Sequence, residues 1–348
     1  MKEMKEIIQN NYLVYVQCNT YNHSNFIKDT LNGFALQETK YPFACVVMDD
    51  YSTDGTPAII KDWIKKECDD SSISYRDTEL ANVYFAQHLK NSNCHFFFYF
   101  LKQNLYADSR KVLLFKQWRD CVKYEAICEG DDYWTYPFKL QEQIDFLETN
   151  DFYSATSSNS FVLRSTSTPM IHFGSEVSKD FYKLNEITVK RKFHTASVVY
   201  RISAMKNCPC YQKGGWDTFM WCCLLTQGPI HYDGKVTCVY RKQQQGVTET
   251  TRGIDWISRM SEWADIIIDC FVPKYVQRRY VVRSITREIV EVAFIKNVWR
   301  NSENRSQIKM LYRHNFSIWN VPNDLKEVVK QCAKKVLRRK TPNSGYYQ

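Results

Sequence analysis

The stretch Cys128-Glu129-Gly130-Asp131-Asp132-Tyr133-Trp134 places three acidic residues where a strand ends and the chain turns. Tyr124 to Ile127 precede it as a short apolar strand, and apolar residues at helical spacing follow Pro137. Ligands of open α/β sheets bind at the carboxyl ends of strands. Because clustered carboxylates repel one another, the arrangement indicates a cation, and loose oxygen ligation suits Mg²⁺ or Mn²⁺ shared with phosphate oxygens. A solvated acidic turn is the alternative.

A second acidic pair follows another apolar strand. Phe43 to Met48 run into Asp49-Asp50, and an earlier strand, Tyr12 to Gln17, ends just before Asn19 and Thr20. Helical patterns separate these strands, which predicts a parallel, doubly wound α/β sheet. Both acidic pairs then lie at one edge of the sheet. A carboxylate there can accept a hydrogen bond from a base N–H or a ribose hydroxyl.

The predicted secondary structure changes along the rest of the chain. The pattern predicts a third strand at Phe96 to Leu101 and helices over 81–89 and 112–122. Later segments predict a helix over 216–225 and a strand over 235–240. Beyond about residue 250 the pattern turns helical, with helices expected over 256–268, 275–294 and 325–337.

Length and composition fit a globular protein of one large domain with an appendage, or of two domains. The chain has 348 residues, of which 44% are hydrophobic. Its 13 cysteines are odd in number and lack paired C-x-x-C spacing, which favours reduced thiols in a cytosolic protein over disulfides or zinc. The first eleven residues are charged and polar, so no signal peptide is expected, and no apolar run approaches the ~20 residues of a membrane span.

The positive charge is concentrated near the C-terminus. From Arg252 onward there are 19 basic and 9 acidic residues, whereas residues 1–251 hold 28 basic and 29 acidic ones. This asymmetry predicts a nearly neutral working domain and a basic tail with an anionic partner.

Three motifs in order resemble glycosyltransferase family 2 with a GT-A fold. They are a first strand ending in Thr20-Tyr21-Asn22, then Asp49-Asp50-x-Ser52-x-Asp54-Gly55-Thr56, then Gly130-Asp131-Asp132-x-Trp134. The stretch 129–147 is similar to bacterial members that build surface polysaccharide. The resemblance covers about residues 10–245. It implies a Rossmann-like GT-A domain over 1–250, with a mostly parallel central sheet and flanking helices, and a basic, mainly helical extension over 251–348.

The resemblance also implies roles for individual residues. Asn19 and Thr20 match positions that line the nucleotide pocket, and Asp50 matches the carboxylate that binds the donor's base. Asp131 would face the ribose or the metal, and Asp132 would hold Mn²⁺ or Mg²⁺ on the diphosphate. Glu129 replaces the first Asp of the commoner Asp-Ala-Asp-Asp form. At Asp54 an Asx turn that starts a helix is the favoured interpretation.

Asp217 is the candidate catalytic base, because the family places an acidic residue at the start of a helix in this later region. An inverting transfer needs one carboxylate to take the proton of the acceptor hydroxyl while a metal stabilises the departing nucleoside diphosphate. A plain helix N-cap is the alternative for Asp217.

One departure from the family pattern lies after the strand 236–240. Relatives often have a His where this chain has Gln243, which can offer a carbonyl oxygen to a hard cation. Arg241 and Lys242 could contact phosphate or be solvated strand-end charges. Arg110 and Lys111 could reach the donor, but neither is assigned. A structural role is favoured for His194.

The last predicted helix has an apolar stripe, with Asn323 as its N-cap and basic residues on its other side. Such a helix can lie on an anionic membrane. Packing on the catalytic domain, with the charges in water, is the favoured alternative. The expected location is cytoplasmic, with peripheral binding at the inner face of the membrane as an option.

The leading hypothesis is therefore an inverting, metal-dependent transfer of a sugar from a nucleoside-diphosphate sugar, UDP-sugar favoured, to a glycan or lipid-linked acceptor. A catalytically weak nucleotide-sugar-binding protein is the alternative. Nucleic-acid binding is disfavoured because no recognised binding motif accompanies the basic tail. A nicotinamide oxidoreductase is disfavoured because no G-x-G-x-x-G follows the first strand.

Overall fold

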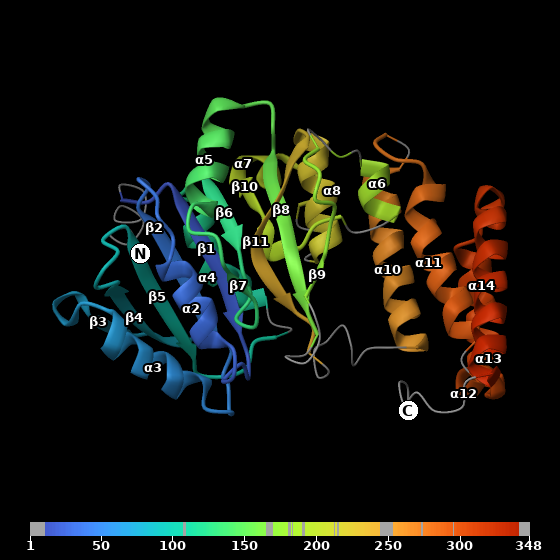
Figure 1. The fold of residues 1–348 in the computed structure, drawn as a ribbon, viewed down its shortest axis with the longest axis horizontal. Coiled ribbons are helices and arrows are strands. Elements are labelled where there is room, and N and C mark those ends of the chain that lie inside the picture. The colour runs from blue at the N-terminus through green and yellow to red at the C-terminus, as the bar shows by residue number, and fades with distance from the viewer. Residues whose placement is uncertain are drawn as a thin grey trace. The chain divides into compact units, whose positions relative to one another are not determined.

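The computed structural model describes residues 11–106, 109–164, 170–179, 182, 184–189, 192–211, 213, 216–243, 253–272, 274–294 and 296–340. Contacts divide the chain into two compact units (Figure 1). The first comprises residues 1–182, 192–211 and 223–243, and the second comprises 183–191, 212–222 and 244–348. The predicted domain boundary after residue 250 stays a prediction, since residues 244–252 lie outside the described part.

The first unit is built on one mixed sheet. Its described strands follow the order β3 (Ser74–Asp77), β4 (Ala81–Gln87), β5 (Cys94–Leu101), β2 (Phe43–Asp49), β1 (Val14–Thr20), β6 (Tyr124–Ile127), β10 (Val199–Arg201), β8 (Ala155–Leu163), β11 (Ile230–Arg241) and β7 (Tyr133–Trp134), with β9 (Ile171–His172) beside β8. The run β5–β2–β1–β6 is parallel, and both flanks contain antiparallel pairs. The predicted α/β class is confirmed.

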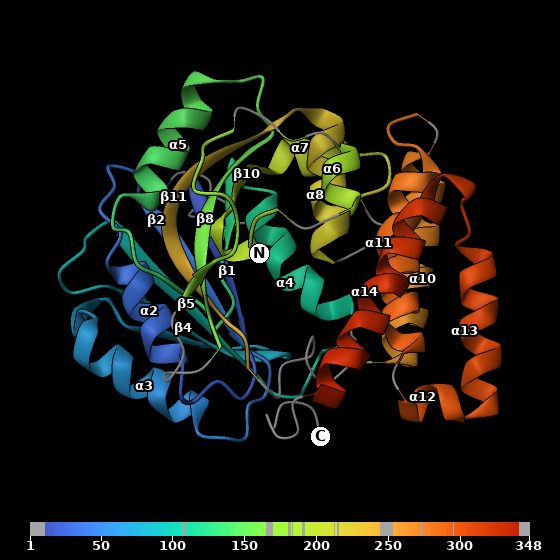
Figure 2. The ribbon, with the colours of Figure 1, turned by 45° about the vertical axis from the view of Figure 1, so that its right-hand side comes forward.

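Helices cover both faces of this sheet, which explains why the parallel strands consist mainly of apolar residues. Every residue of β2 is buried. On one face, α2 (Ile27–Ala35), α3 (Thr56–Glu67) and α5 (Lys139–Thr149) contribute to one core, whereas α4 (Ser109–Arg119) and α7 (Ile202–Asn207) contribute to the core of the other face. Figure 2 shows the helices on either side of the sheet.

The predicted helix over 81–89 is wrong, because residues 81–87 form β4. Backbone pairing with β5 places Phe85 opposite Phe97, and their rings lie 5.0 Å apart. Cross-strand aromatic pairs of this kind stabilise a strand that a helical pattern of apolar residues can equally suggest.

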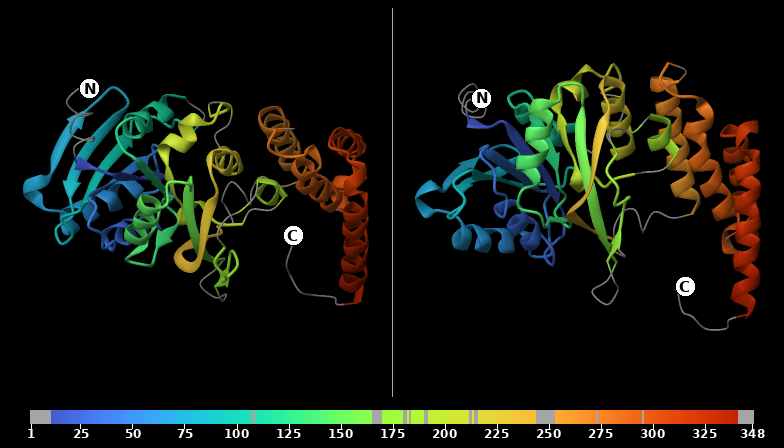
Figure 3. Two further views of the ribbon diagram at one scale, coloured as in Figure 1. Left: turned by 90° about the horizontal axis from the view of Figure 1, so that it is seen from above. Right: turned by 45° about the horizontal axis from the view of Figure 1, so that its top comes forward.

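The second unit is helical. It contains α6 (Leu184–Val189), the first residues of α8 (Asp217–Gln227), α10 (Ile254–Phe271), α11 (Arg278–Ala293), α12 (Lys296–Arg300), α13 (Ser302–His314) and α14 (Val321–Lys340) (Figure 3). The predicted N-cap at Asn323 is wrong, since α14 begins at Val321, and the Asn323 side chain accepts a hydrogen bond from Arg283 instead. None of the described helices combines the length and the apolar composition that a membrane span needs.

All 13 cysteines lie in described residues and are free thiols. Nine are buried, three are half-buried, and Cys332 on α14 is exposed.

Candidate active site

The sequence-predicted donor residues meet at one edge of the parallel strands. Asn19 and Thr20 end β1, Asp50 follows β2, and the acidic motif follows β6. Backbone hydrogen bonds join the three strand ends: the Asp50 N–H donates to the Thr20 carbonyl at 2.9 Å, and the Gly130 N–H donates to the Asn19 carbonyl at 2.8 Å. The acidic motif therefore lies directly against the end of β1.

Gly130 is required by this close approach. A Cβ atom at residue 130 would lie 2.5 Å from Oγ1 of Thr20 and 2.6 Å from its Cβ. Both distances are too short for a real contact, so a larger residue would push the acidic motif away from β1.

Glu129 ties the same two strand ends together. Its carboxylate accepts hydrogen bonds from the backbone N–H of Asn19 at 3.1 Å and from the Asn19 side-chain amide at 3.4 Å. The Oδ1 atom of Asn19 is buried and has no hydrogen-bond partner among the described residues. An orphaned buried acceptor costs free energy, so this atom suits a ligand that brings a donor group.

The end of β11 holds the two aspartates of the motif. The backbone N–H of Arg241 donates to Oδ1 of the buried Asp132 at 2.8 Å, and the Arg241 guanidinium donates to the Asp131 carbonyl at 3.0 Å. Gln243 donates its side-chain amide to Oδ2 of Asp131 at 2.9 Å. Gln243 therefore contacts the motif as a hydrogen-bond donor.

His194 lies beside Asp132 as well. Its Nδ1 accepts a hydrogen bond from the Ala196 N–H at 3.2 Å, so the proton of the neutral ring is on Nε2. Nε2 faces Asp132, 3.7 Å from Oδ2, and the ring stacks on Tyr240 with centroids 4.0 Å apart. A protonated Nε2 offers no lone pair to a metal, so in this arrangement His194 directs a donor toward Asp132 rather than a ligand toward an ion.

Two neighbouring carboxylates, those of Asp131 and Asp132, are thus the candidate metal ligands. In the described residues, no group of three or more His, Cys, Asp or Glu side chains could hold a metal ion. Mg²⁺ is commonly bound by one or two carboxylates together with substrate phosphates and water. The donor set therefore fits a divalent ion that binds together with a diphosphate.

Asp50 is buried and already engaged. Its Oδ1 accepts from the Leu105 N–H at 2.6 Å, and its Oδ2 pairs with Nζ of Lys111 at 2.8 Å. The side chain of Asn104 donates to the Asp50 carbonyl at 3.0 Å. Lys111 is thus the basic residue that reaches this carboxylate.

Asp54 forms the predicted Asx turn. Its Oδ1 accepts from the Thr56 N–H at 3.0 Å at the start of α3, and its Oδ2 accepts from the Ser24 N–H at 2.9 Å. These hydrogen bonds lower the pKa of the Asp54 carboxyl to about 2 although its partial burial opposes them. Asp54 is therefore a structural carboxylate.

Asp217 belongs to the second unit and is the first residue of α8. Beside it, Trp216 stacks on Trp263 of α10 with ring centroids 5.1 Å apart and lies 5.1 Å from the Phe219 ring. This aromatic packing fixes the start of α8 on the helical unit. The role of Asp217 as a base stays a prediction.

Residues 19–81 match the sequence profile described as Glycosyl transferase family 2. This segment is therefore similar to glycosyl transferase family 2. It carries Asn19, Thr20 and Asp50, whereas Asp131 and Asp132 lie beyond it. Uncharacterized proteins of Mycobacterium bovis and Mycobacterium tuberculosis are 33% identical to this chain over 129 residues, which are 37% of this chain and 30% of each relative. The chain therefore matches less than a third of the length of these relatives.

Solved structures share the fold of this chain. Residues 1–349 of S. aureus TarS, crystallised in complex with UDP-GlcNAc, align over 96% of this chain and 93% of that one, with a TM-score of 0.61 and 15% identity. A longer TarS structure aligns over 84% of this chain and 47% of that one, with a TM-score of 0.56 and 17% identity. The likeness confirms the predicted GT-A type of fold.

A buried lysine beneath the motif was missed by the sequence reasoning. Lys139 opens α5, donates to Oε1 of Gln143 at 2.6 Å, and lies over the Trp134 ring, 4.5 Å from its centroid. Trp134 in turn donates to the Ala196 carbonyl at 2.8 Å. The sequence does not indicate that Lys139 is buried, because it stands at the start of a polar helix and lysine is rarely buried.

Burial lowers the pKa of the Lys139 amine to about 8, whereas an unfolded lysine titrates near 10.4. Between these values the unfolded state binds more protons, so this group makes stability rise with pH by up to about 3 kcal/mol. Urea denaturation measures the unfolding free energy of both proteins. We expect the unfolding free energy of the wild type, relative to that of Lys139→Met, to increase as the pH rises from about 8 to 10. Exposed Lys65 provides the control substitution Lys65→Met. Parallel pH curves for wild type and Lys139→Met would contradict the expectation.

Proposed function

We propose that the chain is an inverting, divalent-metal-dependent glycosyltransferase that moves a sugar from a UDP-sugar to a hydroxyl of a glycan or lipid-linked acceptor. The observation that carries the proposal is the meeting of Asp50 and Asp131-Asp132 at adjacent parallel strand ends, in a chain with a family 2 segment. Carboxylates at this edge suit the recognition of a nucleotide and its metal.

The first unit would bind the donor. Asn19, Thr20, Asp50 and Asp131 contact the nucleoside and ribose in this proposal, and Asp132 holds Mn²⁺ or Mg²⁺. When bound, the ion neutralises the charge that develops on the departing diphosphate. The orphaned acceptor of Asn19 and the two adjacent carboxylates of Asp131 and Asp132 support this assignment.

Asp217 would act as the general base. Its carboxylate takes the proton of the acceptor hydroxyl as that oxygen attacks the anomeric carbon, and the nucleoside diphosphate leaves from the opposite face. The configuration at that carbon therefore inverts.

The Asp50–Lys111 pair supports a uridine donor. Uracil presents one N–H between two carbonyl oxygens, whereas guanine presents adjacent N–H donors that a carboxylate accepts in pairs. Lys111 pairs with Oδ2 of Asp50 and the Leu105 N–H donates to Oδ1, so a base would meet the remaining lone pairs of this carboxylate together with an ammonium that can donate to a carbonyl. The pair thus presents one acceptor beside one donor, which complements uracil better than guanine.

Substituting Lys111→Met should lower UDP affinity by roughly 10-fold to 100-fold, because a charge-assisted hydrogen bond is lost. GDP affinity should fall less, so the ratio of UDP to GDP affinity should shrink. Isothermal titration calorimetry measures both. Lys116→Met is the control, since Lys116 lies on the same helix and pairs with Asp120 at the surface. Equal losses of UDP and GDP affinity would contradict the role of Lys111 in base selection.

Titration of UDP and GDP into the wild-type protein, with Mn²⁺ and with EDTA, tests the proposal as a whole. We expect Mn²⁺-dependent binding of UDP, followed by turnover of a UDP-sugar once an acceptor is supplied. The presence of Gln243 where relatives have a His favours a second candidate, a catalytically weak nucleotide-sugar-binding protein. Tight UDP binding without sugar transfer or donor hydrolysis would select it, and a folded protein that binds neither nucleotide would rule out both.

The basic extension, residues 251–348 in the proposed division, would bring the enzyme to an anionic membrane at the cytoplasmic face. On α14, Leu325 and Val329 are exposed together with Lys326 and Lys330. An exposed face that combines apolar and basic side chains suits the surface of such a membrane.

A further inference from the structure

The last helix has an unusual distribution of side chains. On α14 the carboxylates of Asp324 and Glu327 are buried, whereas Leu325 is 59% exposed and Val329 is 68% exposed. Cys332 continues the exposed stripe at helical spacing. A helix that packs in a water-soluble bundle usually buries its apolar stripe and exposes its acids. On α14 the apolar stripe is exposed instead, so it is available to contact another surface.

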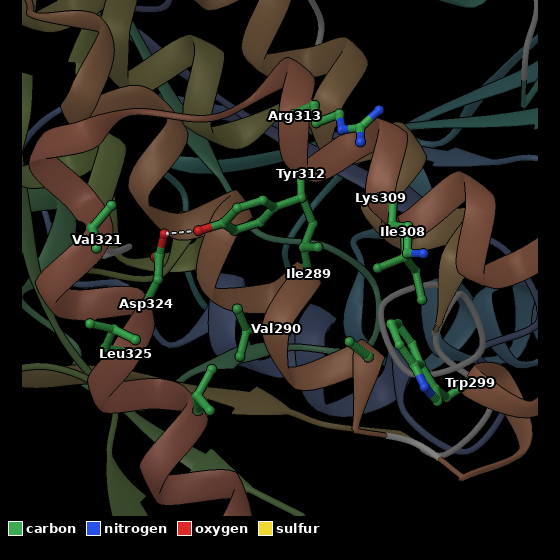
Figure 4. A pocket seen from close by; sticks show the side chains of 12 residues that line it. Ile289, Val290, Trp299, Ile308, Lys309, Tyr312, Arg313, Val321, Asp324 and Leu325 are labelled. Carbon is green, nitrogen blue, oxygen red and sulfur yellow. Dashed lines mark hydrogen bonds between the residues drawn. The ribbon is translucent and has the colours of Figure 1, made fainter.

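A pocket of about 350 Å³ opens beside this stripe, between α11, α12, α13 and α14 (Figure 4). Its walls are mainly apolar, formed by Ile289, Val290, Ala293, Trp299, Ile308, Val321, Leu325 and Val328. Leu325 and Trp299 line the pocket and are also 59% and 41% exposed, so they lie at its mouth. The size falls in the range of ligand sites, and the lining suits a hydrocarbon.

The polar groups of the pocket are divided between wall and rim. In the wall, the Tyr312 hydroxyl donates to Oδ2 of the buried Asp324 at 2.8 Å, so these two groups satisfy each other. Lys309 and Arg313 are exposed, and neither side chain forms a hydrogen bond or an ion pair with another described residue. An apolar cavity with two cations at its edge complements a molecule with an anionic head and a hydrocarbon tail.

We propose that the pocket holds one acyl chain of an anionic phospholipid while Lys309 and Arg313 bind its phosphate. Exposed Trp319 and Val329 would then lie at the bilayer interface, where tryptophan is favoured. One acyl chain alone binds weakly, so the basic residues provide the second signal needed for stable attachment. The inference deepens the membrane contact of the proposed function, but it requires no catalytic activity.

Vesicle binding by the full chain tests the head-group contacts. Co-sedimentation would use phosphatidylcholine vesicles containing about one third phosphatidylglycerol, and phosphatidylcholine alone. We expect Lys309→Glu/Arg313→Glu to lower partitioning into the anionic vesicles at least tenfold, and the wild type to bind neutral vesicles weakly. Lys65→Glu/Lys90→Glu makes the same change of charge at exposed lysines of the first unit and should lower partitioning less than about twofold.

Fluorescence quenching tests the pocket itself. Trp299 lines the mouth, so phosphatidylglycerol with bromine in its acyl chain should quench a component of emission that Trp299→Phe lacks. Ala293→Leu reduces the free volume of the pocket and should weaken that quenching. Equal thermal unfolding of both variants and the wild type would show that the variants are folded. Vesicle binding without quenching of Trp299 would overturn the pocket proposal. If the wild type does not bind vesicles, lipid is not the occupant of the pocket. Lipid is also overturned as the occupant if the protein forms concentration-dependent dimers that Leu325→Lys abolishes.

Failure of this inference can be told apart from failure of the proposed function. UDP binding with Mn²⁺ should be unchanged in Lys309→Glu/Arg313→Glu, because these residues belong to the helical unit. If the wild type binds vesicles with quenching but does not bind UDP, the lipid site stands and the transferase proposal falls. If it binds UDP but does not bind vesicles, the transferase proposal stands and the lipid site falls.

Discussion

Asp132→Asn should abolish measurable Mn²⁺-dependent UDP binding and lower sugar transfer by roughly 10³-fold or more. Asparagine keeps an oxygen at Oδ1, so the hydrogen bond from the Arg241 N–H can persist and the fold should be intact. What is lost is the negative charge of a buried carboxylate beside the expected position of the ion. Calorimetry with and without Mn²⁺, followed by turnover assays, measures both effects.

Asp62→Asn is the control for that substitution. Asp62 is an exposed residue of α3 whose partner is Lys66 at 2.8 Å, and surface pairs of this kind contribute little to stability. It should bind UDP and turn over as the wild type does. Mn²⁺-dependent binding of UDP by folded Asp132→Asn, with wild-type affinity, would remove Asp132 from the metal site.

Asp217→Asn should lower kcat by roughly 10²-fold to 10⁴-fold, the range that general-base catalysis contributes. The KM for the donor and the affinity for UDP with Mn²⁺ should stay near wild type, because the proposed base acts on the acceptor hydroxyl. This separation of kcat from donor binding distinguishes a catalytic carboxylate from one that merely caps α8.

Asp255 offers a matched comparison, since it lies in the first turn of α10 as Asp217 does at the start of α8. Asp255→Asn should cost a few tenths of a kcal/mol of stability, through the helix dipole, and leave kcat unchanged. If Asp217→Asn behaves in the same way, with normal turnover, Asp217 is only a helix-start residue. The base must then be sought elsewhere.

The sheet edge could be predicted from the sequence because its strands are buried on both faces. Such strands are continuous apolar runs, as in Phe43 to Met48, and polar residues that end them must lie at the edge. The order of Asn19, Asp50 and Asp132 in the chain therefore placed them at neighbouring strand ends. The GT-A type of fold is implied by the resemblance of the three motifs to glycosyltransferase family 2, and the structural comparison confirms it.

Other features depend on contacts between distant parts of the chain. The pairing of Lys111 with Asp50 joins residues 61 positions apart, and Gln243 reaches Asp131 across 112 positions. No local pattern indicates which basic residue pairs with which acid. The helix α13 was missed for another reason: only Ile308 and Leu311 of its residues are buried, so its apolar period is too weak to detect.

The tail shows the limit of periodicity most clearly. The sequence predicts an apolar stripe on α14 and favours packing of that stripe on the catalytic domain, because amphipathic helices usually bury it. Within the helical unit, Asp324 is buried against Tyr312 and Leu325 is exposed, whereas packing on the catalytic domain stays a prediction. The hydrogen bond from Tyr312 satisfies this buried acid, and the periodicity of apolar residues does not indicate such a pair.

The cysteines differ in exposure, so thiol labelling can report structural changes in the chain without any substitution. Cys332 is exposed on the same helix stripe as Leu325 and Val329, whereas nine other cysteines are buried. A maleimide dye should therefore label Cys332 first, and its emission would follow contact of that stripe with lipid in a chain without any substitution. Slow modification of buried thiols such as Cys45 and Cys128, which burial keeps protonated by raising their pKa, would time the opening of the sheet core.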